Sequence, residues 1–231
     1  MYKYETHLHT HPVSACANES VFEALDFYKE KGYDGVFITN HFLDGNINID
    51  PDTPYEEKIE FYFSDYEKGL KYGKSIGLKI FSGVEISYRG TDFLVYGLDK
   101  EWYLKNPQIM DMKKSEELEY LMNSGALVIQ AHPYREAIYI DHIRLFPRHV
   151  HGVEIINASG KPSENNMAEI YAKNYGLLEF AGSDNHFFAN GSKLLAGMCS
   201  KVPIVNEEDF IERVKNGEMN VFTLNVDKIQ K

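Results

Sequence analysis

Five short polar motifs, each directly after an apolar run, constrain this chain more than any other feature of its sequence. The first is Glu5-Thr6-His7-Leu8-His9-Thr10-His11. Residues i and i+2 of a β-strand point to the same face, so His7 and His9 place two imidazoles together at a strand end. This pair is half of a metal site. The other half is expected from Thr39-Asn40-His41, Gly83-Val84-Glu85, Ala131-His132-Pro133 and Ser183-Asp184-Asn185-His186.

Apolar runs and helical spacings alternate along the chain. Strands are expected at 2–7, 35–39, 78–84, 93–96, 126–130, 152–157 and 177–181, with a short closing strand at 221–224. Helices are expected at 20–31, 55–75, 113–123, 162–174 and 207–215. This alternation predicts a parallel sheet, and about seven such strands can close into a barrel. The Asn-, Asp- and Gly-rich stretch 41–54 is long enough to be an active-site loop.

Composition excludes several classes of function. The 231 residues suit a single α/β domain spanning 1–231. A net charge of −11 argues against a nucleic-acid-binding surface, although bound divalent ions would reverse the local field and admit a phosphate. Only two cysteines are present, Cys16 and Cys199, so no disulfide framework is expected. No apolar leader and no run of about 18 apolar residues occurs, so we expect a cytoplasmic protein without a membrane span.

The motif residues share one position relative to the expected strands. In an α/β barrel, the side chains that carry chemistry lie at the C-terminal ends of the strands. Seven candidates come at or just past such an end, namely His7, His9, His41, Glu85, His132, Asp184 and His186. Imidazole and carboxylate groups suit zinc, manganese or iron, and a carboxylate can bridge two ions. The pattern therefore predicts a metal cluster at this end of the sheet.

These motifs resemble those of the polymerase and histidinol phosphatase (PHP) family of metal-dependent phosphoesterases. His7-Leu8-His9 matches the family's opening H-x-H, and Thr39-Asn40-His41 resembles its T-D-H. The three later motifs match its G-x-E, A-H-P and S-D-x-H, in the same order along almost the whole chain. The resemblance implies a distorted (β/α)7 TIM-like barrel with a metal cluster at the C-terminal ends of its strands.

The resemblance also implies two or three divalent ions (Zn, Mn or Fe) and a ligand set for each. The ligands of the first ion are expected to be His7, His9, Glu85 and Asp184. Glu85 would bridge to a second ion, which His132 would also hold. The family commonly supplies another His to that ion, and here Asp92 takes the matching position.

A third ion would be held by His41 and His186, and this site departs most from the family. The family usually places an Asp or His five or six residues after the second His of H-x-H. This chain has Ser14 and Ala15 there, followed by Cys16. Two interpretations of Cys16 remain open, a small buried thiol or a thiolate ligand for a soft metal.

Other polar residues near the motifs have two interpretations each. Arg135 either holds a phosphate oxygen or forms a surface ion pair. Asn157 either contacts substrate or supports a ligand, and His11 lines the pocket or lies on the surface. Glu5 and Asn40 replace Asp residues of the family's motifs at positions expected to orient ligating imidazoles. His142, His149 and His151 are expected to be surface histidines or histidines with satisfied hydrogen bonds, without a role in the site.

The function expected from the resemblance is hydrolysis of a small phosphate ester: a phosphomonoester, a nucleotide or a small phosphodiester. A hydroxide bridging the metals would attack phosphorus, Arg135 would neutralise charge, and His41 or His186 would assist the leaving alkoxide. The acidic chain favours a small phosphorylated substrate over a long nucleic acid. The alternatives are a related metal-dependent hydrolase of a C–N or C–O bond, and a non-catalytic module that binds metal or ligand. Retention of nearly all ligand types argues against the second alternative.

Overall fold

The computed structural model describes residues 1–186 and 194–226. The strands are β1 (Tyr2–Leu8), β2 (Gly35–Ile38), β3 (Lys79–Tyr88), β4 (Thr91–Tyr96), β5 (Leu127–Gln130), β6 (Gly152–Asn157), β7 (Leu178–Gly182), β8 (Leu194–Ser200) and β9 (Asn220–Asn225). The helices are α1 (Val21–Glu30), α2 (Tyr55–Ile76), α3 (Lys100–Lys105), α4 (Lys114–Asn123), α5 (Pro162–Tyr175) and α6 (Glu207–Lys215), with a 3-10 turn at Pro107–Asp111. Every strand and helix expected from the sequence is present, with its ends shifted by a few residues.

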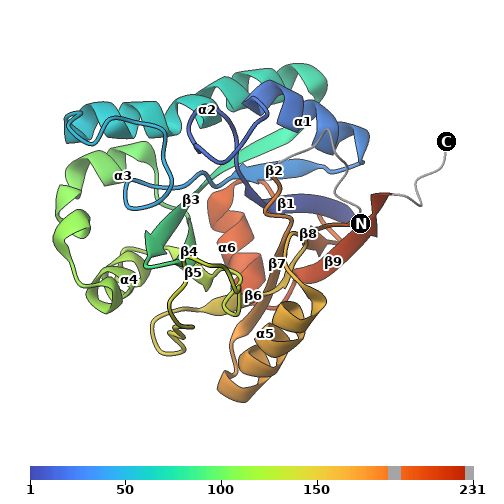
Figure 1. The fold of residues 1–231 in the computed structure, drawn as a ribbon. Helices are drawn as coiled ribbons and strands as arrows, with labels where there is room; N and C mark the ends of the chain where they lie inside the picture. Colours follow the sequence, from blue (N-terminus) through green and yellow to red (C-terminus); the bar gives the residue numbers. More distant parts are fainter. Residues whose placement is uncertain (187–193, 227–231) are drawn as a thin grey trace.

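Strands β1 to β7 form a nearly closed barrel (Figure 1). Along the sheet the order is β7-β6-β5-β4-β3-β2-β1-β8-β9. The ring closes where β7 returns to β1: the Asp184 amide donates to the His7 carbonyl at 2.8 Å, and Leu8 pairs with Asn185 in a parallel bridge. The barrel predicted from the sequence is therefore confirmed.

The prediction of an all-parallel sheet is wrong at β4, which runs antiparallel to both β3 and β5. Arg89 and Gly90, at φ +53° and +79°, form a two-residue turn between β3 and β4. Such a turn joins antiparallel strands, whereas a parallel crossover needs about a dozen residues. Because β4 is reversed, its first residues, Thr91 and Asp92, lie at the same barrel end as the C-terminal ends of the parallel strands.

Two antiparallel strands, β8 and β9, which are joined through helix α6, extend the sheet beyond β1. Strand β8 was not predicted from the sequence; it consists of small and apolar residues and pairs antiparallel with β1, with Met198 opposite Tyr4. Residues 221–224 are in a strand as predicted, but β9 pairs with β8 and does not close the ring. Helix α3, six residues long and capped by the Asp99 side chain, was also not predicted.

Helix α6 covers the N-terminal end of the barrel, and Figure 1 shows it at the centre of the ring of strands. Its Phe210 packs against Phe37 of β2 and Tyr96 of β4, with ring centroids 4.4 Å and 5.6 Å apart. Lys79, which begins β3, donates to the carbonyl of Ile204 just before the helix, at 2.6 Å. The opposite end of the barrel is therefore the end left for a functional site.

The other helices pack on the outside of the sheet. Helix α1 is capped by Ser20, which forms a capping box with Glu23 and so satisfies amides at the helix start. Helix α2 buries Ile59, Tyr62 and Phe63, and lies beside α1 over β2 and β3 (Figure 1). Within the described ranges, no helix has both the length and the apolar character that a membrane crossing requires.

Replacing Phe37 by alanine tests the packing of α6 in the barrel end. The ring is fully buried among aromatic side chains, so Phe37→Ala is expected to lower the free energy of unfolding by about 3–5 kcal/mol. Chemical denaturation measures this loss. The control is Phe22→Ala, at a ring that is 43% exposed on α1, where a loss of about 1 kcal/mol or less is expected. Equal losses in the two variants would contradict this account of the core.

Candidate metal centre

The hydrogen bonds of His9 fix which of its ring nitrogens carries a hydrogen. The Thr10 amide donates to Asn40 Oδ1 at 2.7 Å, and Asn40 Nδ2 donates to Thr10 Oγ1 at 2.9 Å, which sets the orientation of the Asn40 amide. Ser14 Oγ donates to the same Asn40 oxygen at 2.8 Å, so it accepts from His9 Nδ1 at 3.1 Å. Neutral His9 therefore directs the lone pair of Nε2 into the site. The expectation that Asn40 orients an imidazole fits this chain of contacts.

His7 is oriented in the same way by a carboxylate that the sequence analysis missed. Its Nδ1 lies 3.0 Å from Glu154 Oε1 on β6, so Nε2 faces the interior of the site. Glu154 is fully buried and also accepts from the His132 amide at 3.1 Å. The available signal was a lone acid within the otherwise apolar run 152–156. Glu154 thus supports two of the expected ligands.

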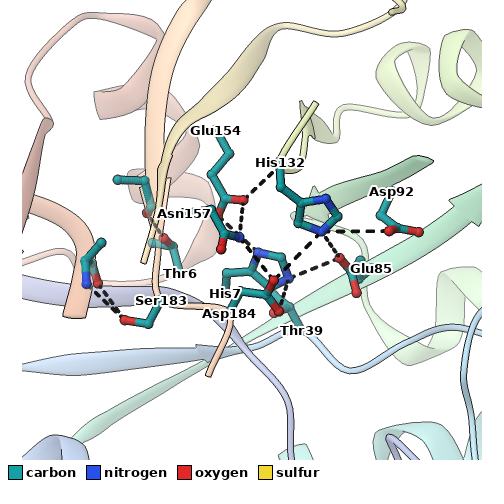
Figure 2. A network of polar contacts seen from close by, with 12 residues as sticks. Thr6, His7, Thr39, Glu85, Asp92, His132, Glu154, Asn157, Ser183 and Asp184 are labelled. Carbon is teal, nitrogen blue, oxygen red and sulfur yellow. Dashed lines mark hydrogen bonds and ion pairs between the residues drawn. The ribbon is translucent and has the colours of Figure 1, made fainter. Parts of the chain in front are cut away.

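Glu85 lies among four imidazoles, and Figure 2 shows it facing those of His7 and His132. Its Oε1 is 3.1 Å from His7 Nε2 and 3.4 Å from His132 Nε2. Its Oε2 is 3.2 Å from His9 Nε2 and 2.7 Å from His41 Nδ1. Within the described part of the chain, neither oxygen receives a hydrogen bond of acceptable geometry, although both are buried. A lone pair of neutral His9 facing a carboxylate oxygen is repulsive unless a cation lies between them.

Asp184 and Arg135 complete the other wall of the site. Asp184 Oδ1 lies 3.5 Å from His7 Nε2 and 3.4 Å from His9 Nε2. Its Oδ2 accepts from Arg135 Nη2 and, at 3.1 Å, from Asn157 Nδ2. The ion pair of Arg135 is thus with a buried carboxylate rather than on the surface. Asn157 supports Asp184, and its Nδ2 also lies 2.8 Å from Glu154 Oε2.

Two of the expected ligands occupy the left-handed backbone region. His132 has φ +24° and Asp184 has φ +50°. Such conformations cost about 1–3 kcal/mol each in residues other than glycine and collect at functional sites. Each is held by a hydrogen bond from its own amide, to Glu154 Oε2 and to the His7 carbonyl respectively. The turn of the backbone aims both side chains into the site.

The remaining predicted residues lie beside this centre or away from it. Asp92 Oδ2 is 3.7 Å from His132 Nε2, at the start of β4 (Figure 2). Glu5 accepts from the His7 amide at 2.9 Å, so it holds the backbone of β1 rather than an imidazole. His11 and His142 are exposed, and His149 and His151 are half-buried outside the site. Loop 41–54 borders the site through His41 and Asn46.

Cys16, His41 and His186 form a second corner of the site, beside His9. The His9 ring stacks on His186 with centroids 4.5 Å apart and lies 4.4 Å from the His41 ring. Burial raises the pKa of the Cys16 thiol, but hydrogen bonds with His186 and His41 outweigh it and lower that pKa to about 5. The structure thus brings Cys16 to the two histidines that the family resemblance assigns to a third ion.

Electrostatics hold the central carboxylates in their charged form. Burial raises the pKa of Glu85, but the charges of His41 and His7 outweigh it and hold this pKa well below its usual range. Burial acts on Asp184 in the same way, and Arg135 and His7 reverse it. Burial and repulsion by His41 lower the pKa of His9, which therefore stays neutral near pH 7. Charged carboxylates and a neutral imidazole are the states that bind metal. Burial lowers the pKa values of His7 and His41, but the carboxylates outweigh it and raise both, so these imidazoles would release a proton when an ion binds.

Three sets of potential ligand atoms result, and within each set all atoms lie within 4.8 Å of one another. The sets are His7, Glu85 and His132; His7, His9 and Asp184; and His9, Cys16, His41 and His186. Together with the donor-free oxygens of Glu85, these sets fit divalent ions such as zinc, manganese or iron. A cavity of about 450 Å³ opens onto them, and its wall includes Cys16, His41, Asp92, Arg135, Tyr139 and His186.

Comparisons with known proteins find the same fold in several solved structures. No protein-family model matches the chain, and no curated protein matches it in sequence. A two-domain protein from Bacteroides vulgatus, described as containing a predicted PHP-like metal-dependent phosphoesterase, matches over 96% of this chain with a TM-score of 0.69 and 14% identity. The match spans 64% of that protein, less than two thirds of its length.

Two further structures share the fold. PsfC from Pseudomonas syringae matches over 98% of this chain and 93% of its own, with a TM-score of 0.59 and 15% identity. An amidohydrolase from Chromobacterium violaceum, solved with sulfate and without metal, matches over 94% of this chain and 97% of its own, with a TM-score of 0.55 and 13% identity. At these identities the likeness shows the fold, and the chemistry must be argued from the site.

Removing the charge of Glu85 tests its central role. Glu85→Gln keeps the size of the side chain but loses the anion that faces four imidazoles, so we expect at least one fewer equivalent of bound zinc or manganese per chain. Elemental analysis after loading and desalting measures the ion count. Glu116→Gln, on an exposed face of α4, is the control and should leave the count unchanged. Full metal content in Glu85→Gln would contradict the assignment.

Glu154 is tested by its effect on metal affinity. Glu154→Gln weakens the acceptor that orients His7, and loss of such support typically costs about 10–100-fold in metal affinity. Competition with a chromophoric chelator measures this loss. Glu179→Gln, at an exposed position of the neighbouring strand β7, is the matched control. Unchanged affinity in Glu154→Gln would show that Glu154 has only a packing role.

Proposed function

We propose that this chain is a metal-dependent hydrolase of a small phosphate ester. The observation that carries the proposal is the Glu85 carboxylate, buried among four imidazole nitrogens with no hydrogen-bond donor of its own in the described structure. The fold shared with a protein described as containing a PHP-like metal-dependent phosphoesterase supports the same class. Divalent ions bound here would act as Lewis acids toward a phosphoryl oxygen and lower the pKa of a bound water.

The side chains of the cavity wall suit a phosphate group. Arg135 borders the cavity, and one of its amino groups is engaged by Asp184. Its planar guanidinium presents further donors, which can bind phosphate oxygens and neutralise charge that develops during the reaction. His41 and His186 border the same cavity, where they can assist departure of the leaving oxygen, either directly or by holding an ion whose bound water does so. A volume of about 450 Å³ suits a small molecule rather than a long polymer.

Hydrolysis of a C–N or C–O bond is the second candidate. It is supported by the shared fold of the amidohydrolase from Chromobacterium violaceum. The same ligand set would serve a carbonyl substrate, since metal ions polarise carbonyl and phosphoryl oxygens alike. Paired substrates separate the two candidates: p-nitrophenyl phosphate and bis(p-nitrophenyl) phosphate against p-nitrophenyl acetate and a p-nitroanilide. The phosphate esters should be turned over by protein loaded with zinc or manganese, and chelation should abolish turnover.

Arg135→Ala is the variant that tests phosphate recognition. Loss of one charged donor to the reacting phosphate is expected to lower kcat/KM for the phosphate ester by about 100–1,000-fold. Steady-state kinetics on the metal-loaded protein measures the change, and Arg148→Ala at an exposed position is the control. If Arg135→Ala reacts as fast as the parent with phosphate esters, Arg135 serves only to hold Asp184. Turnover of the amide or carboxylate ester alone would favour the second candidate.

A further inference from the structure

We propose that Cys16 is a thiolate ligand, together with His41 and His186, of a distinct ion site that selects zinc over magnesium and manganese. This inference rests on the metal-dependent function proposed above, and it adds a ligand and a metal preference to one corner of the site. The carboxylate-rich sets around Glu85 and Asp184 have no sulfur ligand. The site would therefore contain ligand sets with two different metal preferences, one with a sulfur ligand and the others rich in carboxylate oxygen.

The loop that carries Cys16 is fixed at several points. The Ala15 amide donates to the Asn46 carbonyl at 2.9 Å, and the Asn18 amide donates to the His186 carbonyl at 3.3 Å. Ser14, two residues before the cysteine, accepts from the His41 amide at 3.0 Å. The residues on either side of Cys16 are thus tied to the same segments that carry the two histidines. The thiol is held toward them rather than placed there by a free loop.

The histidine neighbours supply the other ligands. His9 belongs to the same set of close ligand atoms, but its Nδ1 is engaged by Ser14 and its Nε2 lies 3.2 Å from Glu85 Oε2. That nitrogen can serve one ion at a time, and His9 also belongs to the set with His7 and Asp184, which assigns it to the carboxylate-rich side. His41, whose Nδ1 lies 2.7 Å from Glu85 Oε2, belongs to the set with Cys16 alone. Cys16, His41 and His186 remain as three protein ligands.

Three ligands next to an open cavity form a recognisable coordination pattern. All three residues line the cavity of about 450 Å³. Zinc sites that take part in reactions keep three protein ligands and leave a fourth position for water or substrate. Structural zinc sites, by contrast, are usually closed by four protein ligands. The position of this corner on the cavity wall therefore favours a site that substrate can reach.

Sulfur sets the metal preference of this corner. A thiolate is a soft ligand that favours zinc, cobalt or cadmium, whereas magnesium and manganese favour oxygen. Binding requires the thiolate, so the thiol proton is released to solvent when the ion enters. The other interpretation is a free thiol that lines the cavity. Cys199 is the matched comparison, because it is buried in β8 opposite Lys3 and lies outside every set of ligand atoms among the described residues.

Cobalt substitution tests the proposal by spectroscopy rather than by activity. Full-length protein loaded with Co²⁺ is expected to show a near-ultraviolet thiolate-to-cobalt charge-transfer band. The band should persist in Cys199→Ser and disappear in Cys16→Ser, which should also bind one zinc fewer per chain. Cys16→Asp replaces sulfur by oxygen ligands, so it should restore the ion count without the band and bind manganese in this corner. Persistence of the band and of full zinc content in Cys16→Ser would overturn the proposal.

Thiol alkylation gives an independent measurement. If zinc occupies the thiolate, reaction of Cys16 with iodoacetamide should slow by about 100-fold at a free zinc concentration about 100 times Kd. Equal rates with and without zinc would overturn the proposal. Failure of this inference is distinguishable from failure of the proposed function. If the parent protein binds two ions but shows no thiolate band, only the assignment of Cys16 as a ligand is wrong. If the parent protein binds no ions, both this assignment and the proposed metal-dependent function are wrong.

Discussion

The buried carboxylate of Glu85 is the group around which this end of the barrel is arranged. An ion taken out of water costs several kcal/mol unless opposite charge surrounds it. Its neighbours are imidazole nitrogens that come from several elements. His7 is in β1 and His9 directly follows it, while His41 and His132 lie in the segments after β2 and β5. Imidazolium or a metal ion can compensate the charge, and the tautomer of His9, fixed by Ser14 and Asn40, favours a metal at that position. Residues from separate strands are therefore brought together around one buried charge that must be compensated.

Closure of the barrel sets the positions of these groups. Glu5 Oε1 accepts from the amides of His7 and Ser183, which lie on the two sides of the junction between β1 and β7. Burial raises the pKa of Glu5 to about 7. Gly182 at the same junction has no room for a side chain, since an added Cβ would lie 2.4 Å from the Cβ of His7. The backbone contacts directly below the site thus decide how close Asp184 comes to His7 and His9.

The sequence was most informative about the site where histidines recur at the ends of expected strands. The barrel followed from alternating strand and helix patterns, and the structure brings the motif residues together because parallel strands end at one edge. The reversal of β4 was missed although only Arg89-Gly90 separates it from β3, because alternation was given more weight than loop length. Strand β8 was missed because its small residues show no periodic pattern of apolar and polar positions. Glu154 was missed because it lies inside an apolar strand, where partners in space decide its role.

The charges of the site link its metal content to its substrate. Glu85, Asp92, Glu154 and Asp184 are four carboxyl groups in mutual proximity, and Arg135 is the guanidinium paired with one of them. Burial and the charge of Glu85 raise the pKa of Asp92, which shows that even the resident anions repel one another. Without metal, the carboxylates raise the pKa values of His7 and His41 against the effect of burial, so protonated imidazoles offset part of this negative charge. Divalent ions that bind the imidazoles take the place of these protons and bring more positive charge into the site. Metal binding would therefore favour an anionic phosphate ester more than a neutral amide, in addition to its role in breaking a bond.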